Sequence, residues 1–222
     1  MALFRYRIQG EGFDYWKEVQ FYVESFQHYS VEINKFIDVE IATARERYNA
    51  FLLELQNDPT WEHEWFDYEL ELNTKEGLAD IYMDSLIISM YSFVECKMLF
   101  LCEYFEKGQV FKVRDIAGKS ITGYRKYLEK AAGMDFALVQ AEWADLLKYN
   151  ELRNIPLHHI GTRTLPGKNR QLIEFLNSTP GVEVVRDGDM ARFRFRSNEF
   201  VFAFFRTCHF ILDYLFHEKV KM

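Results

Sequence analysis

Apolar residues recur at helical spacing over two long stretches in the first half of the chain. From Tyr15 to Leu55 they follow one another every three or four residues, with no proline or glycine between them. The second stretch runs from about Lys75 to Glu106 and ends just before Gly108, a residue type that commonly stops a helix. We therefore predict two long helices, of which the first contains at most one break.

A strongly acidic segment joins these two stretches. From Glu54 to Glu76 the chain carries eight acidic residues and the single base Lys75. Within it, Asp58-Pro59-Thr60 has the residue types of a turn followed by a helix start. We expect this segment to be a solvated connector.

Shorter elements follow in the second half of the chain. Helical spacing predicts one helix from about Ser120 to Ala132 and another from about Ala137 through Arg153. A proline and a glycine indicate a loop over Thr162 to Arg170, and a short helix is expected from Gln171 to Asn177. The next two segments, Val182 to Arg186 and Ala191 to Arg196, alternate around an Asp-Gly-Asp turn, which is typical of a β-hairpin.

The order of these elements predicts the fold class. A last helix is expected from about Glu199 to His217, capped by Ser197 or Asn198. The result is a mainly all-α fold, a bundle of long helices with a small β-hairpin insertion at about 182–196 before the last helix. Because 49% of the 222 residues are apolar and no stretch separates two cores, we expect a single domain over 1–222.

Charges within the most apolar stretches argue against a membrane span. Three charged residues interrupt Leu86 to Phe105, and two interrupt Phe200 to Phe216. The N-terminus lacks the uninterrupted apolar core of a secretory signal, and three cysteines, an odd number, make a poor disulfide framework. We therefore expect no membrane segment and a reducing, cytoplasmic location.

The cysteines and histidines lack the spacing of a metal site. Cys96, Cys102 and Cys208 lie in apolar helical surroundings without Cys-x-x-Cys spacing, so we expect them to be buried. His63 has no second histidine one helical turn away, as a zinc-hydrolase helix would have. We predict neither a metal nor another cofactor.

The end of the helix predicted through Arg153 carries the residues best suited to chemistry. Arg153, Asn154, His158 and His159 follow one another closely there. Arginine offers phosphate oxygens a planar and permanently charged fork. Histidine can both give and accept a proton near neutral pH. Together they indicate a site for phosphodiester chemistry.

This stretch resembles the Arg-x4-6-His signature of the HEPN superfamily, which consists of small all-helical proteins. Arg153 and His158 match the four-residue spacing, and Asn154 matches the polar residue often found directly after the arginine. Arg153 and His159 match the five-residue spacing, so which histidine is essential stays open. The resemblance implies a metal-independent endoribonuclease. An inactive HEPN-like module that binds a nucleotide, RNA or another protein is the alternative.

The resemblance also implies partners. HEPN ribonucleases typically form homodimers in which two copies of the motif face one cleft. Some act as toxins or in phage defence and are restrained by a protein inhibitor, an antitoxin. The run from Phe200 to Phe205, apolar around the whole helix, fits a homodimer and equally fits an enclosed helix of a monomer.

The motif itself does not fit one continuous helix. Residues five apart on a regular helix point about 140° away from each other, which would separate Arg153 from His158. Pro156 lies between them and disfavours helix there. Either a kink brings the two side chains together, or the arginine of one chain serves the histidine of another.

In this reading His158 is the general acid or base, and His159 is a reserve proton carrier. Arg153 binds the phosphate, and Asn154 orients the phosphate or the imidazole. Glu95 interrupts an apolar helix and resembles an acidic residue that many HEPN proteins carry on an earlier helix. We predict that it pairs with Arg153, the alternative being a carboxylate on the polar side of its helix.

Cations near the motif are candidates for binding RNA. No acidic residue occurs from Leu152 through Ile173, and Arg163, Lys168 and Arg170 are expected to contact phosphates. Arginines at positions 186, 192, 194 and 196 on the hairpin extend this surface or, alternatively, pair with the acidic segment before Glu76. The formal net charge of −7 weakens non-specific attraction to RNA.

Overall fold

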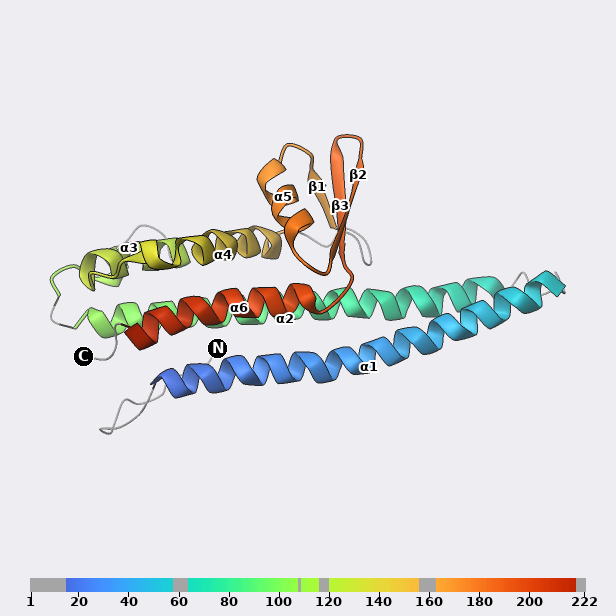
Figure 1. Cartoon of the computed structure of the whole chain (residues 1–222), viewed down its shortest axis with the longest axis horizontal. Coiled ribbons are helices and arrows are strands. Elements are labelled where there is room, and N and C mark those ends of the chain that lie inside the picture. Colours follow the sequence, from blue (N-terminus) through green and yellow to red (C-terminus); the bar gives the residue numbers. More distant parts are fainter. Residues whose placement is uncertain (1–14, 58–63, 108, 116–119, 156–162, 219–222) are drawn as a thin grey trace.

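Two long antiparallel helices form the base of the molecule (Figure 1). The computed structural model describes residues 15–57, 64–107, 109–115, 120–155 and 163–218. Helix α1 spans Tyr15–Asn57 and α2 spans Trp65–Phe105, which confirms the two predicted long helices. α2 begins ten residues earlier than expected, so the predicted connector was wrong from Trp65 onward. The predicted turn at residues 58–60 lies outside the described residues.

Packing between the two helices explains the early start of α2. Apolar side chains of α1 that are shielded from solvent alternate three and four residues apart, as in a coiled coil: Ile37, Ile41, Ala44, Tyr48, Phe51 and Leu55. The Phe51 ring stacks on Tyr68 of α2 at 4.5 Å between centroids. An ion pair joins Arg45 of α1 to Glu76 of α2 at 2.9 Å. These contacts hold the acidic segment in a helix whose carboxylates face solvent or α1.

Three further helices cover one side of this pair. They are α3 (Ile121–Ala131), α4 (Gln140–Arg153) and α6 (Glu199–Asp213), and a π-turn at Tyr214–Glu218 extends α6. α3, α4 and the last helix lie where the apolar spacing predicted them. The 3-10 turn η3 (Phe136–Val139) occupies the first residues predicted for α4.

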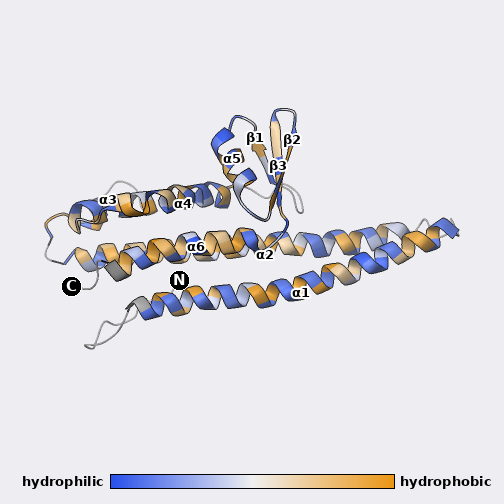
Figure 2. Cartoon of the chain, in the orientation of Figure 1, coloured by the Kyte–Doolittle hydropathy of each residue, from blue (hydrophilic) through white to orange (hydrophobic). Residues whose placement is uncertain are grey.

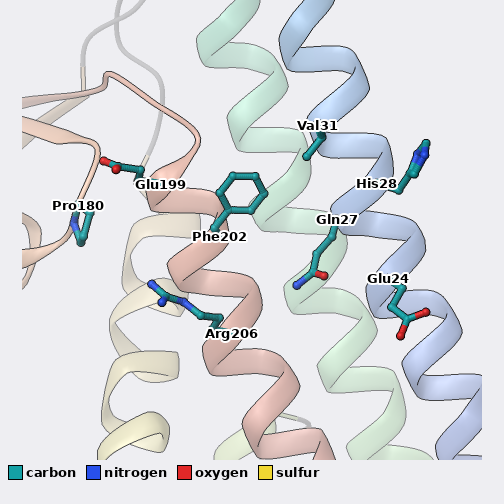
Figure 3. A pocket seen from close by; sticks show the side chains of 8 residues that line it. All are labelled: Glu24, Gln27, His28, Val31, Pro180, Glu199, Phe202 and Arg206. Carbon is teal, nitrogen blue, oxygen red and sulfur yellow. The ribbon is translucent and has the colours of Figure 1, made fainter.

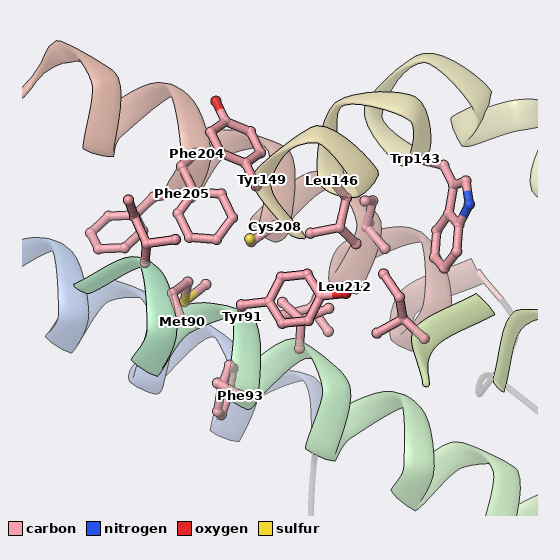
Figure 4. Close-up of a cluster of buried hydrophobic side chains, with 14 of the residues drawn as sticks. Met90, Tyr91, Phe93, Trp143, Leu146, Tyr149, Phe204, Phe205, Cys208 and Leu212 are labelled. Carbon is pink, nitrogen blue, oxygen red and sulfur yellow. The ribbon is translucent and has the colours of Figure 1, made fainter. Parts of the chain in front are cut away.

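The core lies where α2, α4 and α6 meet (Figure 4). The rings of Tyr149 and Phe204 are 4.3 Å apart between centroids, and both side chains are buried. Phe205 and Cys208 of α6 reach the same cluster, in which Met90 of α2 is fully buried. The run that is apolar around the helix is therefore largely enclosed within one chain.

A small α/β insertion sits on α2 between α4 and α6. It consists of β1 (Arg163–Pro166), α5 (Arg170–Ser178), β2 (Val182–Asp187) and β3 (Met190–Phe195), with antiparallel strand order β1-β3-β2. The hairpin is confirmed, and Gly188 supplies the positive φ of 58° that its two-residue loop requires. Strand β1 was expected to be a loop, because nothing in its own four residues indicates the partner strand β3.

Helix α2 is the element around which the others are arranged. It contacts α1, α3, α4, α6 and β3. One window of α2 is long and apolar enough to cross a membrane by length and composition, and half of that window is buried within the molecule, as in the core helix of a soluble protein. Apolar residues of α2 are found both in the core, as Leu86 and Met90, and at exposed positions, as Leu78 and Ile81; Figure 2 colours the chain by hydropathy.

Candidate functional site

The predicted motif begins at the C-terminal end of α4. The helix ends at Arg153, and Asn154 is its C-cap, with its backbone N–H donating to the carbonyls of Glu151 and Leu152. Asn154 is exposed. Pro156, His158 and His159 lie outside the described residues, so the geometry between arginine and histidine remains a prediction.

Arg153 is held against α2 by a carboxylate and a ring. Its Nη1 lies 3.8 Å from Oε2 of Glu95, which confirms the predicted pairing as an ion pair without a direct hydrogen bond. The guanidinium carbon lies 4.2 Å from the centroid of the Tyr91 ring, within the range of a cation–π interaction. The Arg153 side chain keeps 25% exposure, so an anion from solvent can still reach it.

Two neutral groups complete the surroundings of Arg153. Burial raises the pKa of the Tyr91 hydroxyl well above its usual value, so this ring stays neutral beneath the guanidinium. Asn150 lies one turn before Asn154 on α4, and its Oδ1 is buried with no hydrogen-bond partner among the described residues. Such an oxygen can accept a hydrogen bond from a neighbouring side chain or a ligand.

Arg163 does not lie open to solvent. Its side chain forms an ion pair with Asp84 of α2 and lies 4.6 Å from the Phe195 ring centroid. Only 3% of the residue is exposed. Arg163 therefore anchors β1 to α2, and we do not assign it the predicted contact with RNA.

The other predicted RNA-binding cations are exposed. Lys168 lies in the turn after β1, and Arg170 begins α5. Within the described part of the chain neither residue has an ion pair with an acidic side chain. Both remain available to phosphates.

The hairpin arginines pair within the hairpin. Arg192 contacts Asp187 at 2.6 Å and Arg196 contacts Glu183 at 2.5 Å. The alternative of pairing with the acidic segment was wrong for these two residues, because strand pairing places acids of β2 beside them. Alternation along β3 turns the exposed Arg192 away from the buried Phe193.

Buried charges beneath the insertion should leave a signature in the pH dependence of stability. Burial raises the pKa of the Asp80 carboxyl, although Arg163 opposes the shift, so folding favours the protonated form. This contribution is complete below the unfolded-state pKa and is lost as the pH rises through the higher folded-state pKa. We therefore expect the unfolding free energy of the wild type, relative to Asp80→Asn, to fall as the pH rises above the ordinary pKa of an aspartate. Thermal denaturation from acidic to neutral pH tests this, and parallel curves for the two proteins would contradict it.

Two hollows lie away from Arg153. One lies between α1 and α6 (Figure 3) and is lined by Glu24, Gln27, His28, Val31, Pro180, Glu199, Phe202 and Arg206. The other, of about 400 Å³, is lined by residues that include Glu142, Asp145, Tyr149 and Arg206. Burial and the neighbouring Glu142 raise the pKa of Asp145 there. Arg153 and Glu95 line neither hollow.

The cysteines differ from expectation at one position. Cys102 and Cys208 are buried, as predicted, but Cys96 is exposed on α2. An apolar sequence around a residue does not reveal which side of a helix a neighbour covers. Among the described residues, no three His, Cys, Asp or Glu side chains come together in a way that could hold a metal ion.

Comparisons of this chain with protein-family models, with curated proteins and with solved structures found no match.

Proposed function

We propose that this protein is a metal-independent endoribonuclease of the HEPN type, with Arg153 as its phosphate-binding residue. The observation that carries the proposal is the placement of Arg153 against Glu95 and Tyr91. A guanidinium held on two sides and open on another can bind a phosphate without first having to be ordered. Asn154, His158 and His159 follow directly in the sequence.

The proposed reaction is an internal transesterification of RNA. The ribose 2′-hydroxyl attacks the adjacent phosphorus, the P–O2′ bond forms and the P–O5′ bond breaks. The 2′-hydroxyl proton passes to a base and the departing 5′-oxygen receives a proton, a role for His158 with His159 in reserve. Arg153 stabilises the charge that develops on the phosphate. Asn154 orients the phosphate.

The setting proposed for this activity is the cytoplasm. A ribonuclease acting on cellular RNA requires control, so a protein inhibitor of the antitoxin kind is the proposed partner. Lys168 and Arg170, exposed on the insertion, extend the phosphate-binding surface.

Binding without cleavage is the second candidate function. Glu95 favours it, because its carboxylate pairs with Arg153 and competes with an incoming phosphate for the guanidinium. In that case the chain recognises a nucleotide or RNA end and leaves it intact.

Cleavage of a defined RNA in EDTA separates these two candidates. The enzyme is expected to yield 2′,3′-cyclic phosphate and 5′-hydroxyl ends. A substrate with a single 2′-deoxyribose should resist at that position only, because the nucleophile is missing there. A folded protein that retains the RNA on a filter but does not cleave it would establish the binding module instead.

A further inference from the structure

One face of α2 is exposed, apolar and free of charge over most of the length of the helix. Its positions lie three or four residues apart, and every one of them is exposed: Phe66, Leu70, Thr74, Leu78, Ile81, Ser85, Ile88 and Ser92. We call these eight residues the α2 stripe. Because other apolar residues of α2, such as Leu86, Met90 and Val94, are buried, α2 carries apolar residues on a covered side and on an exposed one.

The large side chains of the α2 stripe are too exposed and too well aligned for an ordinary surface. Phe66 is 61% exposed and Ile81 is 55% exposed, while Leu70, Leu78 and Ile88 are each about half exposed. Single exposed apolar residues are common, but aligned rows of them mark places where another surface binds.

The α2 stripe is complementary to itself when read in the opposite direction. About a midpoint near residue 79, Leu78 faces Ile81 and Leu70 faces Ile88, so these four apolar side chains meet one another. The same reversal sets the hydroxyl of Thr74 against that of Ser85.

From this pattern we infer that the α2 stripe binds the α2 stripe of a second copy of this chain, antiparallel and about a two-fold axis near residue 79. In a two-fold dimer the same surface of both copies must fit itself, and the α2 stripe has similar residues when it is read in either direction. At the ends of the interface the large Phe66 lies opposite the small Ser92.

The charges beside the α2 stripe agree with this pairing. On one border Glu71 falls opposite Ser89 of the second copy, and on the other Asp84 falls opposite Asn73. No two like charges oppose each other at these positions, and Asp84 is already paired with Arg163. Antiparallel pairing therefore brings no carboxylates together at these borders.

The area fits a weak dimer. Five large side chains at about half exposure give an apolar area of roughly 500 Å² on each copy, so the pair would cover about 1,000 Å², which is below the roughly 1,200–2,000 Å² of stable specific interfaces and in the range of weak, transient ones. We expect a dimer that dissociates on dilution rather than an obligate one.

This dimer keeps the two candidate sites apart. Glu95 lies sixteen residues from the proposed axis, which places the two copies of Glu95 about 48 Å from each other along the paired helices. The inference therefore does not rest on the proposed function. Loss of RNA cleavage and loss of dimerisation are separate measurements on separate residues.

Sedimentation of the full chain over a range of concentrations tests the interface. Ile81→Lys is expected to shift the protein to monomer, since it places a cation opposite Leu78. Val39→Lys is the matched control, because Val39 is a β-branched residue 62% exposed on α1 and outside the α2 stripe. Circular dichroism checks that both variants are folded. A wild type that stays monomeric, or a dimer that survives Ile81→Lys, would overturn the inference.

Cross-linking tests the direction and the register. In a Cys96→Ser background, Thr74→Cys and Ser85→Cys chains should form disulfide-linked dimers only when mixed, because position 74 meets position 85 and not itself. Cross-linking of either variant alone would contradict the antiparallel register. Capture of the monomer by lipid vesicles, abolished by Ile81→Lys, would assign the α2 stripe to a membrane surface and reject the dimer.

Discussion

Alanine at position 153 or 158 is expected to remove nearly all RNA cleavage while leaving the fold intact. Loss of the Arg153 guanidinium should cost about 10²–10³ in kcat, the effect of losing one charge-stabilising donor. Loss of the His158 imidazole should cost about 10²–10⁴, the range for a general acid or base. Glu95→Gln retains the size of the side chain but removes its charge, so we expect an intermediate loss as Arg153 becomes less well positioned.

The matched control for these variants is Arg45→Ala. Arg45 pairs with a glutamate of α2, as Arg153 does, but its partner Glu76 comes nineteen residues before Glu95 on that helix. Its removal should leave cleavage unchanged. Equal losses in Arg45→Ala and Arg153→Ala would show that a general charge effect, rather than a site, explains the activity.

Mixing the Arg153→Ala and His158→Ala proteins distinguishes the two arrangements that the motif allows. Recovery of activity would mean that one chain supplies the arginine and another the histidine. The α2–α2 dimer predicts no recovery, because its two sites are far apart. His159→Ala, assayed alone, identifies which of the two histidines carries the proton.

The largest effect on stability is expected at Arg163. In Arg163→Ala, the largely buried carboxylate of Asp84 loses its ion-pair partner. The neighbouring buried Asp80 loses the favourable charge of Arg163 as well. Breaking a buried pair in this way typically costs about 3–5 kcal/mol. For a chain of this size, the expected fall in melting temperature is roughly 6–20 °C. Differential scanning calorimetry of the two proteins measures it.

Replacing both Arg163 and Asp84 separates the cost of leaving one buried charge unpaired from the stabilisation that the ion pair itself provides. Burial lowers the pKa of Arg163 to about 10, which shows that desolvation outweighs the attraction of nearby carboxylates. Arg163→Met combined with Asp84→Leu is therefore expected to be close to the wild type in stability. A double variant as unstable as Arg163→Ala would show that the ion pair itself stabilises the attachment of the insertion.

Local patterns predicted the elements whose partners lie nearby in the sequence. The hairpin of β2 and β3 was found from alternation around one glycine, and α3 from the spacing of its apolar residues. The structure adds that the Ser120 side chain caps α3 by accepting a hydrogen bond from the Gly123 N–H. Strand β1 was missed because it forms only by pairing with β3, more than twenty residues later. The start of α2 was misplaced because the acidic segment was judged by its charge, and the apolar residues spaced between the acids were not taken into account.

In the candidate site, the sequence predicted one ion pair correctly but did not predict which cationic side chains are exposed to solvent. A lone carboxylate in an apolar helix correctly indicated that Glu95 has a cationic partner. The acid-free run suggested that Arg163 faces solvent, yet its partner Asp84 lies on an element about eighty residues away. A single sequence gives no sign of such a distant pairing.

The central place of α2 also determines when the chain can complete its fold. Its partners α4 and α6 are synthesised after it, and about a hundred residues separate the end of α2 from the end of α6. At roughly 5–20 residues per second, a ribosome needs about 5–20 s to deliver them. During that time the apolar residues of α2 that pack against α4 and α6 stay exposed. Chaperone dependence, and aggregation of C-terminally shortened chains, should therefore be governed by this one helix.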